Sequence, residues 1–303
     1  MRSDVTVVVP TYNQADFLGE ALRSVIAQDF AGWRAIVVNN HSTDGTREVV
    51  ASIDDPRIEL VDFANHGIIA ASRNVGIERA DSEFVAFLDS DDWWSPTKLS
   101  RCVTALGTEF DVVCHAEEWR SASDSRVVRY GPANRSGYRE LLLGGNCLST
   151  SAVVGRTETF RRLGGFSVDP RFVTAEDYDL WLRVAQSGGR FRFIDDVLGV
   201  FRIHGSSASS AVDRNVAAEM AVVEHHLSRA AFAGPRVRRR REARSHYAAG
   251  RAHHAAGNDR AALRRLLRSI RLNPLFPRVH AAFVLTVVSA VRRAVPIGRG
   301  SRA

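Results

Sequence analysis

The sequence of 303 residues has almost no lysine and little cysteine. Lys98 is the only lysine among 41 basic residues, which indicates genome composition rather than selection for guanidinium groups. The three cysteines, Cys102, Cys114 and Cys147, lie far apart and in no spacing that suits a zinc site. This excludes a disulfide framework and a metal held by thiolates, and it leaves small buried thiols. The N-terminus also lacks the apolar run and cleavage site of a signal peptide, so we expect a cytoplasmic protein.

Long hydrophobic runs are missing too. The thirteen mostly apolar residues at 279–291 fall short of the roughly 20 that span a bilayer. They predict either a buried helix or an interfacial helix beside Arg292, Arg293 and Arg299. With 45% hydrophobic and 25% charged residues, the composition matches a folded protein with a sizeable core and excludes disorder as the dominant state.

The net charge of +7 is unevenly spread along the chain. Residues 229–303 carry eighteen arginines and two acidic residues, a net charge of +16, whereas residues 1–228 carry −9. A basic tail suits an anionic membrane surface or a nucleic acid. Because this tail has no interleaved aromatic residues and no recognised reading motif, we expect no nucleic-acid partner.

Buried strands and amphipathic helices alternate over the first ninety residues. We expect strands at Val5–Val9, Ala35–Val38, Ile58–Val61 and Phe84–Leu88, and helices at Asp16–Ala27, Thr46–Ile53 and Ile68–Ala80. This alternation predicts an α/β fold with a mostly parallel sheet flanked by helices. Ligands of such sheets bind beyond the carboxyl ends of the strands.

Further elements are expected between residues 112 and 203. They are a hairpin at 112–129, strands at 148–154, 191–194 and 197–203, and helices at 157–163 and 177–187. Beyond a boundary near residue 212 the composition shifts to Ala, Arg and His. We therefore expect a domain at 1–212 and a helical, Arg-rich appendage at 213–303. Residues 247–274 resemble one tetratricopeptide-type helix pair, which cannot bury its own face.

Three carboxylates, Asp89, Asp91 and Asp92, follow the fourth expected strand. Such clusters are stable mainly when a cation or hydrogen-bond donors neutralise them. Oxygen ligands favour magnesium or manganese held together with phosphate oxygens. The alternative is a solvated acidic turn that caps a helix starting at Pro96.

Other polar motifs accompany this cluster in a fixed order. They are Pro10-Thr11-Tyr12-Asn13, the turn at residues 39–45, Arg73 in the third helix, Asp89-Ser90-Asp91 and Glu176-Asp177-Tyr178-Asp179. In this order the sequence resembles the inverting glycosyltransferases of family 2, which have the GT-A fold, over residues 4–205. The resemblance implies transfer of a sugar from a nucleoside diphosphate sugar to a hydroxyl of a glycan or lipid-linked glycan, in cell-surface polysaccharide synthesis.

The resemblance also assigns roles at the donor site. The donor-binding residues it implies are Pro10, Tyr12, Asn40, Asp44, Arg73 and Asp89. Tyr12 matches the aromatic residue that lies against the base. Asn40 stands where the family usually has an aspartate that accepts the uracil N–H. Because an amide both donates and accepts, the base stays open, with a UDP-sugar as the first expectation.

A divalent cation, Mn²⁺ or Mg²⁺, is the implied cofactor. The resemblance assigns it to Asp89, Asp91 and His204, with Asp92 a neighbour of less certain role. His204 and Arg202 belong to an R-x-H element that the family often carries near the diphosphate or the metal. A lone histidine beside glycine and serines is also compatible with an ordinary surface position.

On the acceptor side the resemblance makes Asp177 the general base. Glu176 and Asp179 are either supporting residues or the acidic first turn of a helix. Trp93 and Trp94 either stack on a sugar face or pack in the core.

Two rival interpretations remain. A nucleotidyltransferase would need a glycine-rich loop after the first strand, and residues 10–13 are not one. A non-catalytic nucleotide-sugar-binding scaffold would act through the helical tail, and only Asn40 favours it. The tail is the expected place for homo-oligomer contacts and for peripheral contact with the inner face of the plasma membrane, near a lipid-linked acceptor.

Overall fold

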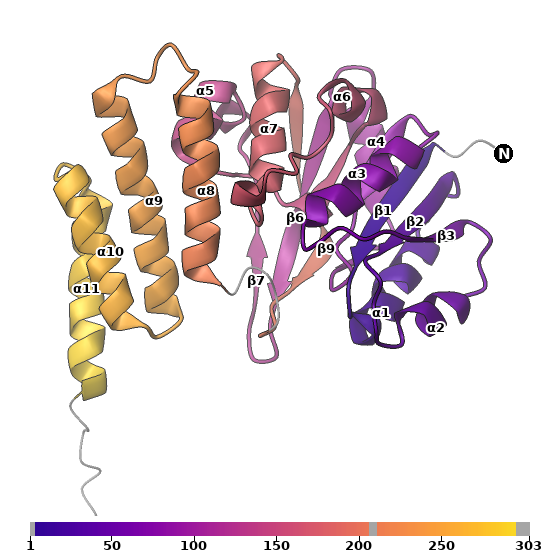
Figure 1. Ribbon diagram of the computed structural model, residues 1–303, viewed down its shortest axis with the longest axis horizontal. Coiled ribbons are helices and arrows are strands. Elements are labelled where there is room, and N and C mark those ends of the chain that lie inside the picture. The colour runs from indigo at the N-terminus through magenta and orange to yellow at the C-terminus, as the bar shows by residue number, and fades with distance from the viewer. Residues whose placement is uncertain (1–3, 206–210, 295–303) are drawn as a thin grey trace, which may run out of the picture. The chain divides into compact units, whose positions relative to one another are not determined.

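The computed structural model describes residues 4–205 and 211–294, and the chain divides into two compact units, residues 1–210 and 211–303 (Figure 1). The first unit contains a nine-stranded sheet. Its strands are β1 (Val5–Thr11), β2 (Trp33–Asn39), β3 (Ile58–Asp62), β4 (Phe84–Phe87), β5 (Trp93–Trp94), β6 (Val112–Arg120), β7 (Ser125–Val128), β8 (Val153–Arg156) and β9 (Phe191–Arg202). Its helices are α1 (Ala15–Ile26), α2 (Thr46–Ala51), α3 (Ile69–Arg79), α4 (Lys98–Leu106), α5 (Tyr138–Gly144), α6 (Thr157–Arg162) and α7 (Glu176–Gln186).

The order of the strands is β3-β2-β1-β4-β8-β6-β9-β5, with β7 paired to β6. Strands β1 to β4 pair in parallel, and β6 pairs in parallel with β9. Strand β8 runs antiparallel between β4 and β6. The predicted α/β fold with a mostly parallel sheet and flanking helices is confirmed.

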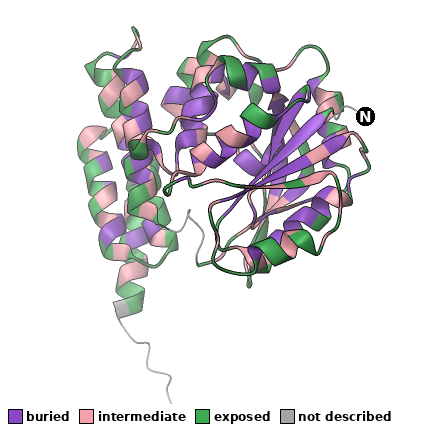
Figure 2. Ribbon diagram, turned by 45° about the vertical axis from the view of Figure 1, so that its right-hand side comes forward, coloured by how far each residue is buried: buried purple, intermediate pink, exposed green. Residues whose placement is uncertain are grey.

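Helices cover both faces of this sheet, as the buried strands in Figure 2 illustrate. On one face Val7 of β1 belongs to a core cluster with Leu22 of α1 and Leu99 of α4. On the other face a Cβ at Gly76 of α3 would come within 2.3 Å of the Val8 side chain, so only glycine permits this approach. Because both faces are buried, the strands appear in the sequence as continuous apolar runs.

Three predicted strands differ from the structure. Residues 148–154 are not one strand, because Thr150–Ala152 form a 3₁₀ turn and β8 begins only at Val153. The turn lets Ser151 accept hydrogen bonds from Asp89 N–H and from the indole of Trp94. The strands expected at 191–194 and 197–203 are one strand, β9, with a bulge opposite His115 and Ala116. Helix α5 was not predicted, because seven residues show too little helical period.

The second unit consists of four helices in its described part, α8 (Val212–Leu227), α9 (Pro235–Ala255), α10 (Asp259–Leu272) and α11 (Pro277–Ala294). Helices α9 and α10 pack closely against each other, since a Cβ at Gly250 would lie 2.6 Å from Leu266, and their likeness to a tetratricopeptide pair stays a prediction. Helix α9 starts at Pro235, well before residue 247, because its Arg-rich first half also packs: Arg241 is buried and pairs with Glu219 at 2.6 Å. No helix in the described residues is both long and apolar enough to cross a membrane.

Candidate active site

Strands β1, β2 and β4 end at one edge of the sheet and deliver polar loops there. Pro10 is buried inside β1, and two residues later Tyr12 is 55% exposed, so its ring is open to a ligand. Asn13 adopts a left-handed backbone with φ of 50°. It donates to Ser42 Oγ at 2.9 Å and accepts from Thr43 N–H at 2.8 Å, which ties the loops after β1 and β2 together.

Asp44 caps two helices at this edge. Its Oδ2 accepts from Ala15 N–H at 2.9 Å, at the start of α1. Its Oδ1 accepts from the amide and the hydroxyl of Thr46, at the start of α2. Although burial opposes the charge, these hydrogen bonds lower the pKa of Asp44. Both carboxylate oxygens are therefore engaged within the protein, and a donor contact by Asp44 stays a prediction.

Asn40 extends from the end of β2 toward the loop after β3. Its Oδ1 accepts a hydrogen bond from Asn65 N–H at 2.9 Å. This contact orients the side-chain amide and uses one of the two lone pairs on its oxygen. The amide N–H groups of Asn40 stay available to donate to a ligand.

The two aspartates of the Asp89-Ser90-Asp91 motif have different partners. Asp89 Oδ1 accepts from Arg73 Nη2 at 2.7 Å. Asp91 Oδ2 lies 2.9 Å from His204 Nε2, and the His204 ring packs against Phe17 at 4.8 Å between centroids. Burial and the neighbouring Asp89 raise the pKa of Asp91. The structure thus places His204 beside the motif, not at an ordinary surface position.

Asp92 and Arg202 fasten this loop to the end of β9. Asp92 is buried, and its Oδ1 accepts from Arg202 N–H at 2.9 Å. Burial, followed by Asp91 and Glu117, raises the pKa of Asp92 well above its ordinary value. Arg202 Nε donates to the backbone carbonyl of Asp91 at 2.9 Å. Asp92 and Arg202 therefore hold the Asp89-Ser90-Asp91 loop against the end of β9.

The two tryptophans separate in role. Trp94 is buried and donates through Nε1 to the Ser151 carbonyl at 2.9 Å. Of the two alternatives for Trp94, the structure favours packing in the core, where Lys98 Nζ lies 3.3 Å from its ring centroid. Trp93 is half-buried, with the guanidinium carbon of Arg202 4.5 Å from its ring centroid.

Sequence reasoning missed two buried charged residues beneath the motif. Lys98 is fully buried, with Nζ 3.3 Å from the Trp94 ring centroid and no hydrogen-bond partner in the described part of the chain. Burial lowers its pKa to about 7. Glu117 accepts from the Tyr130 hydroxyl at 2.5 Å, and burial raises its pKa to about 7. The available signals were a single lysine in the whole chain and an acidic residue on an apolar strand.

Arg73 links the donor side to α7. Its Nη1 donates to Glu176 Oε1 at 2.7 Å, while Nη2 holds Asp89. Glu176 Oε2 in turn accepts from Thr174 N–H at 2.7 Å. Although burial disfavours the cation, Asp89 and Glu176 raise the pKa of Arg73. Since both terminal nitrogens are occupied here, a nucleotide contact by Arg73 stays a prediction.

Asp177 follows at the first turn of α7. Its Oδ2 accepts from Asn146 Nδ2 at 3.1 Å and from Thr150 Oγ1 at 3.4 Å. Burial and the adjacent Glu176 raise its pKa to about 6. The group is therefore mainly ionised at neutral pH and still able to accept a proton. Asp179, by contrast, is buried and pairs with Arg183 at 2.8 Å, which supports a structural role.

A metal site is not preformed in the described residues, where no three His, Cys, Asp or Glu side chains are arranged to hold an ion. Asp89, Asp91 and His204 nevertheless offer hard oxygen and imidazole donors side by side. The repulsion between the two carboxylates, which contributes to the raised pKa of Asp91, is what a divalent cation would relieve. The donor set therefore fits Mn²⁺ or Mg²⁺.

Comparison with known proteins identifies relatives of this chain. The family model described as "Glycosyl transferase family 2" matches residues 6–164. The putative teichuronic acid biosynthesis glycosyltransferase TuaG of Bacillus subtilis is 28% identical over 68% of this chain and 81% of its own. A second relative is the UDP-Glc:alpha-D-GlcNAc-diphosphoundecaprenol beta-1,3-glucosyltransferase WfgD of Escherichia coli. It is 31% identical over 59% of this chain and 69% of its own.

Solved structures share the fold. The mannosyltransferase PcManGT from Pyrobaculum calidifontis, in complex with GDP-Man and Mn²⁺, has a TM-score of 0.64 at 23% identity, over 98% of this chain and 82% of its own. TarS of S. aureus in complex with UDP has a TM-score of 0.60 at 20% identity, over 96% and 92%. With the match of the family model to more than half of the sequence, the chain belongs to glycosyl transferase family 2 and is a glycosyltransferase.

Proposed function

We propose that this enzyme is a metal-dependent, inverting glycosyltransferase that uses a UDP-sugar and a lipid-linked glycan acceptor in cell-surface polysaccharide synthesis. The names of its relatives support the substrates: WfaP and WfgD transfer glucose from UDP-Glc to a GlcNAc-diphosphoundecaprenol, and TuaG is named for teichuronic acid biosynthesis. We assign this activity to residues 1–212 and treat residues 213–303 as an appended helical domain.

The environment of Asp177 carries the proposal. In an inverting transfer one carboxylate deprotonates the acceptor hydroxyl on the face opposite the leaving group, without a covalent sugar intermediate. Asp177 has a pKa of about 6, and Asn146 and Thr150 orient its Oδ2. Its neighbour Glu176 is joined through Arg73 to Asp89. These contacts would hold the base at a fixed position relative to the donor-binding loop.

Residues at the strand ends would bind the nucleotide. The exposed ring of Tyr12 offers a flat apolar face to the base. Asn40 would donate its amide N–H to a carbonyl of the base, since its oxygen already accepts from Asn65. Pro10 and Asp44 would shape the two loops that frame the nucleotide.

Asp89, Asp91 and His204 would hold the divalent cation. When bound, the ion supplies positive charge that offsets the charge on the departing diphosphate. Arg202 and Trp93 would keep the Asp91 backbone in place beside it.

Calorimetric titration tests this proposal. We expect the purified protein to bind UDP in the presence of manganese, more weakly with chelator, and to prefer UDP over GDP and dTDP. Transfer from a UDP-sugar to a synthetic lipid-diphosphate-linked GlcNAc should follow, and Asp177→Asn should lower its rate by about 10²–10⁴-fold. A folded protein that binds none of the three nucleotides would contradict the proposal and favour the non-catalytic scaffold.

A further inference from the structure

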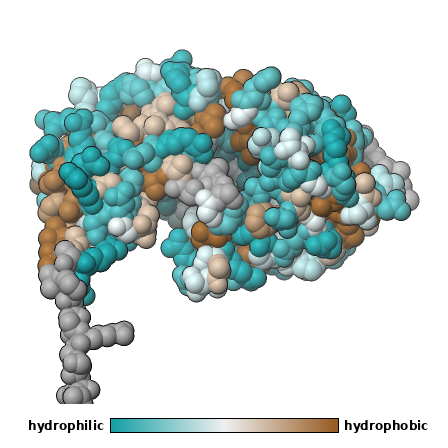
Figure 3. Space-filling view, turned by 60° about the horizontal axis from the view of Figure 1, so that its bottom comes forward, coloured by the Kyte–Doolittle hydropathy of each residue, from teal (hydrophilic) through white to brown (hydrophobic). Residues whose placement is uncertain are grey.

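Helix α11 presents a row of exposed aliphatic side chains. The exposed fractions are 59% for Val284, 61% for Leu285, 43% for Val288 and 56% for Val291. At 3.6 residues per turn these side chains share one side of the helix, opposite the buried Val279, Ala282 and Thr286. Figure 3 correspondingly shows a narrow strip of hydrophobic surface at its left edge. We call these four exposed residues the apolar row.

Arginines flank the apolar row in the sequence, and no acidic residue follows Asp259. Residues 260–303 contain ten arginines and no aspartate or glutamate. Arg278 and Arg292 are exposed near the two ends of the row. Arg293 is oriented differently and forms an ion pair with Asp259 at 2.6 Å.

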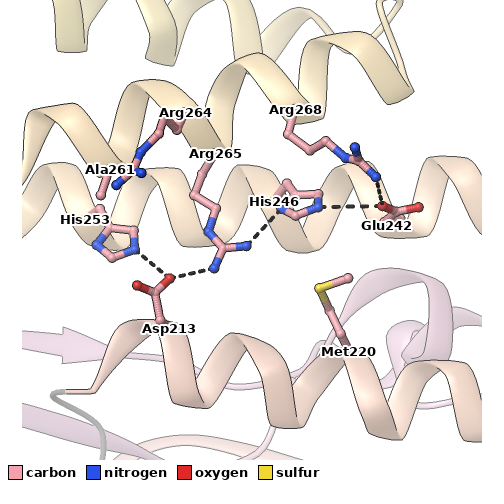
Figure 4. Close-up of a pocket in the computed structure, with 9 residues that line it drawn as sticks. All are labelled: Asp213, Met220, Glu242, His246, His253, Ala261, Arg264, Arg265 and Arg268. Atoms are coloured by element: carbon pink, nitrogen blue, oxygen red, sulfur yellow. Dashed lines mark hydrogen bonds and ion pairs between the residues drawn. The ribbon is translucent and has the colours of Figure 1, made fainter.

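The acidic residues of the neighbouring helices are already committed. A pocket of about 500 Å³ lies among α8, α9 and α10 (Figure 4). In it Asp213 pairs with His253 and Arg265, and Glu242 pairs with His246 and Arg268. Asp213 and Glu242 therefore do not neutralise Arg278 or Arg292, the exposed arginines near the apolar row.

We propose that α11 docks on an anionic membrane surface. The apolar row would enter the boundary between headgroups and acyl chains, and Arg278 and Arg292 would contact lipid phosphates. An anionic lipid offers acyl chains to the aliphatic side chains of this face and negatively charged phosphates to its arginines. A second copy of the chain would bring the same arginines face to face, which opposes self-association. The helix lies on the membrane and does not span it.

The apolar row and the donor-site residues belong to different units of the chain, and testing the row needs no transferase activity. Its failure is therefore distinguishable from failure of the proposed function. Membrane attachment would hold the enzyme near a lipid-linked acceptor.

Vesicle sedimentation of the full chain tests the proposal. We expect binding to vesicles that contain phosphatidylglycerol, little binding to phosphatidylcholine alone, and weakening by salt. Leu285→Asp with Val288→Asp should lower the partition coefficient at least about tenfold, because charge replaces buried apolar surface. Arg278→Gln with Arg292→Gln should lower it about five-fold per arginine on the anionic vesicles. Val127→Asp with Val168→Asp, at exposed fractions of 47% and 51% in the first unit, is the matched control and should bind normally.

Unaltered binding of the Leu285 and Val288 variant would overturn the proposal, provided that its melting temperature matches that of the wild type. If the aspartates prevent folding, Leu285→Ser with Val288→Ser makes the same comparison. Failure of the wild-type chain to bind anionic vesicles would also overturn the proposal. Gel filtration would then identify what covers the apolar row. A dimer that the substitutions dissociate would assign the row to contact with a second copy of the chain. A monomer would assign it to contact with another part of the same chain.

Discussion

Arg73 and Glu176 form a buried ion pair of 2.7 Å although 103 positions separate them in the sequence. The same guanidinium holds Asp89 at 2.7 Å, so one cation satisfies a carboxylate from the D-x-D loop and one from α7. Because Arg73 and Glu176 are both buried, neither side chain can move into bulk water without breaking the ion pair between them. The donor side and the first turn of α7, which carries Asp177, are thereby held in a fixed relation.

Removing this cation should destabilise the fold strongly. Arg73→Met leaves Glu176 buried without a counter-charge, and we expect a loss of about 3–5 kcal/mol in the free energy of unfolding. Urea denaturation followed by circular dichroism measures it. Arg79→Met is the matched control, since it lies on the same helix in an exposed pair with Glu59 and should cost about 0–1 kcal/mol. Equal losses in the two variants would show that the pair does not anchor α7.

Transfer should depend on the ionisation of Asp177. Its pKa of about 6 means that the base is protonated and inactive below this pH, so kcat/KM should rise as pH increases through about 6 and then level off. Asp177→Asn should lower kcat by about 10²–10⁴-fold and leave the Kd for the nucleotide nearly unchanged. Asp179→Asn serves as the control: it breaks the pair with Arg183 and should lower stability without moving the pH profile. A profile that stays flat between pH 5 and 7 would remove Asp177 as the base.

The part of the site that lies at strand ends could be predicted from the sequence. Tyr12, Asn40 and Asp89 each follow a buried strand, and parallel strands bring their carboxyl ends to one edge. Local periodicity therefore suffices to gather these three residues. It also places Asp177 at the start of a helix.

Partners across the fold could not be predicted in this way. The pairing of Arg73 with Glu176 depends on how α3 meets α7, which no local pattern records. The burial of Trp94 depends on the turn at Ser151, which interrupts what looks in sequence like a strand. Asp44 likewise resembles a free loop carboxylate until the starts of α1 and α2 are placed beside it.

Asn40→Asp should report how the base is recognised. Because Asn40 Oδ1 already accepts from Asn65 N–H, the substitution exchanges the remaining amide donor for a carboxylate acceptor. If the amide donates to a carbonyl of the base, UDP should bind about tenfold more weakly, since two acceptors would then face each other. Calorimetry with UDP measures this change. Tighter binding by the variant would mean instead that the base presents an N–H to residue 40.

Lys98 should make stability depend on alkaline pH. Burial lowers its pKa in the folded state to about 7 from the ordinary value of 10.5. Below pH 7 the folded protein carries the full cost of a buried charge. Between pH 7 and 10.5 the folded state sheds this proton while the unfolded state keeps it, so the free energy of unfolding should rise with pH.

Lys98→Met tests this by removing the titrating group while filling a similar volume against Trp94. Urea denaturation across this alkaline range should show the wild type gaining stability with pH relative to the variant. Glu117 titrates near pH 7, so the comparison is cleanest above that value. Arg101→Met, an exposed position on the same helix, should keep the wild-type pH dependence. Parallel curves for wild type and Lys98→Met would show that the buried amine does not change its charge in this range, and its burial would then require a counter-charge that stays bound to it.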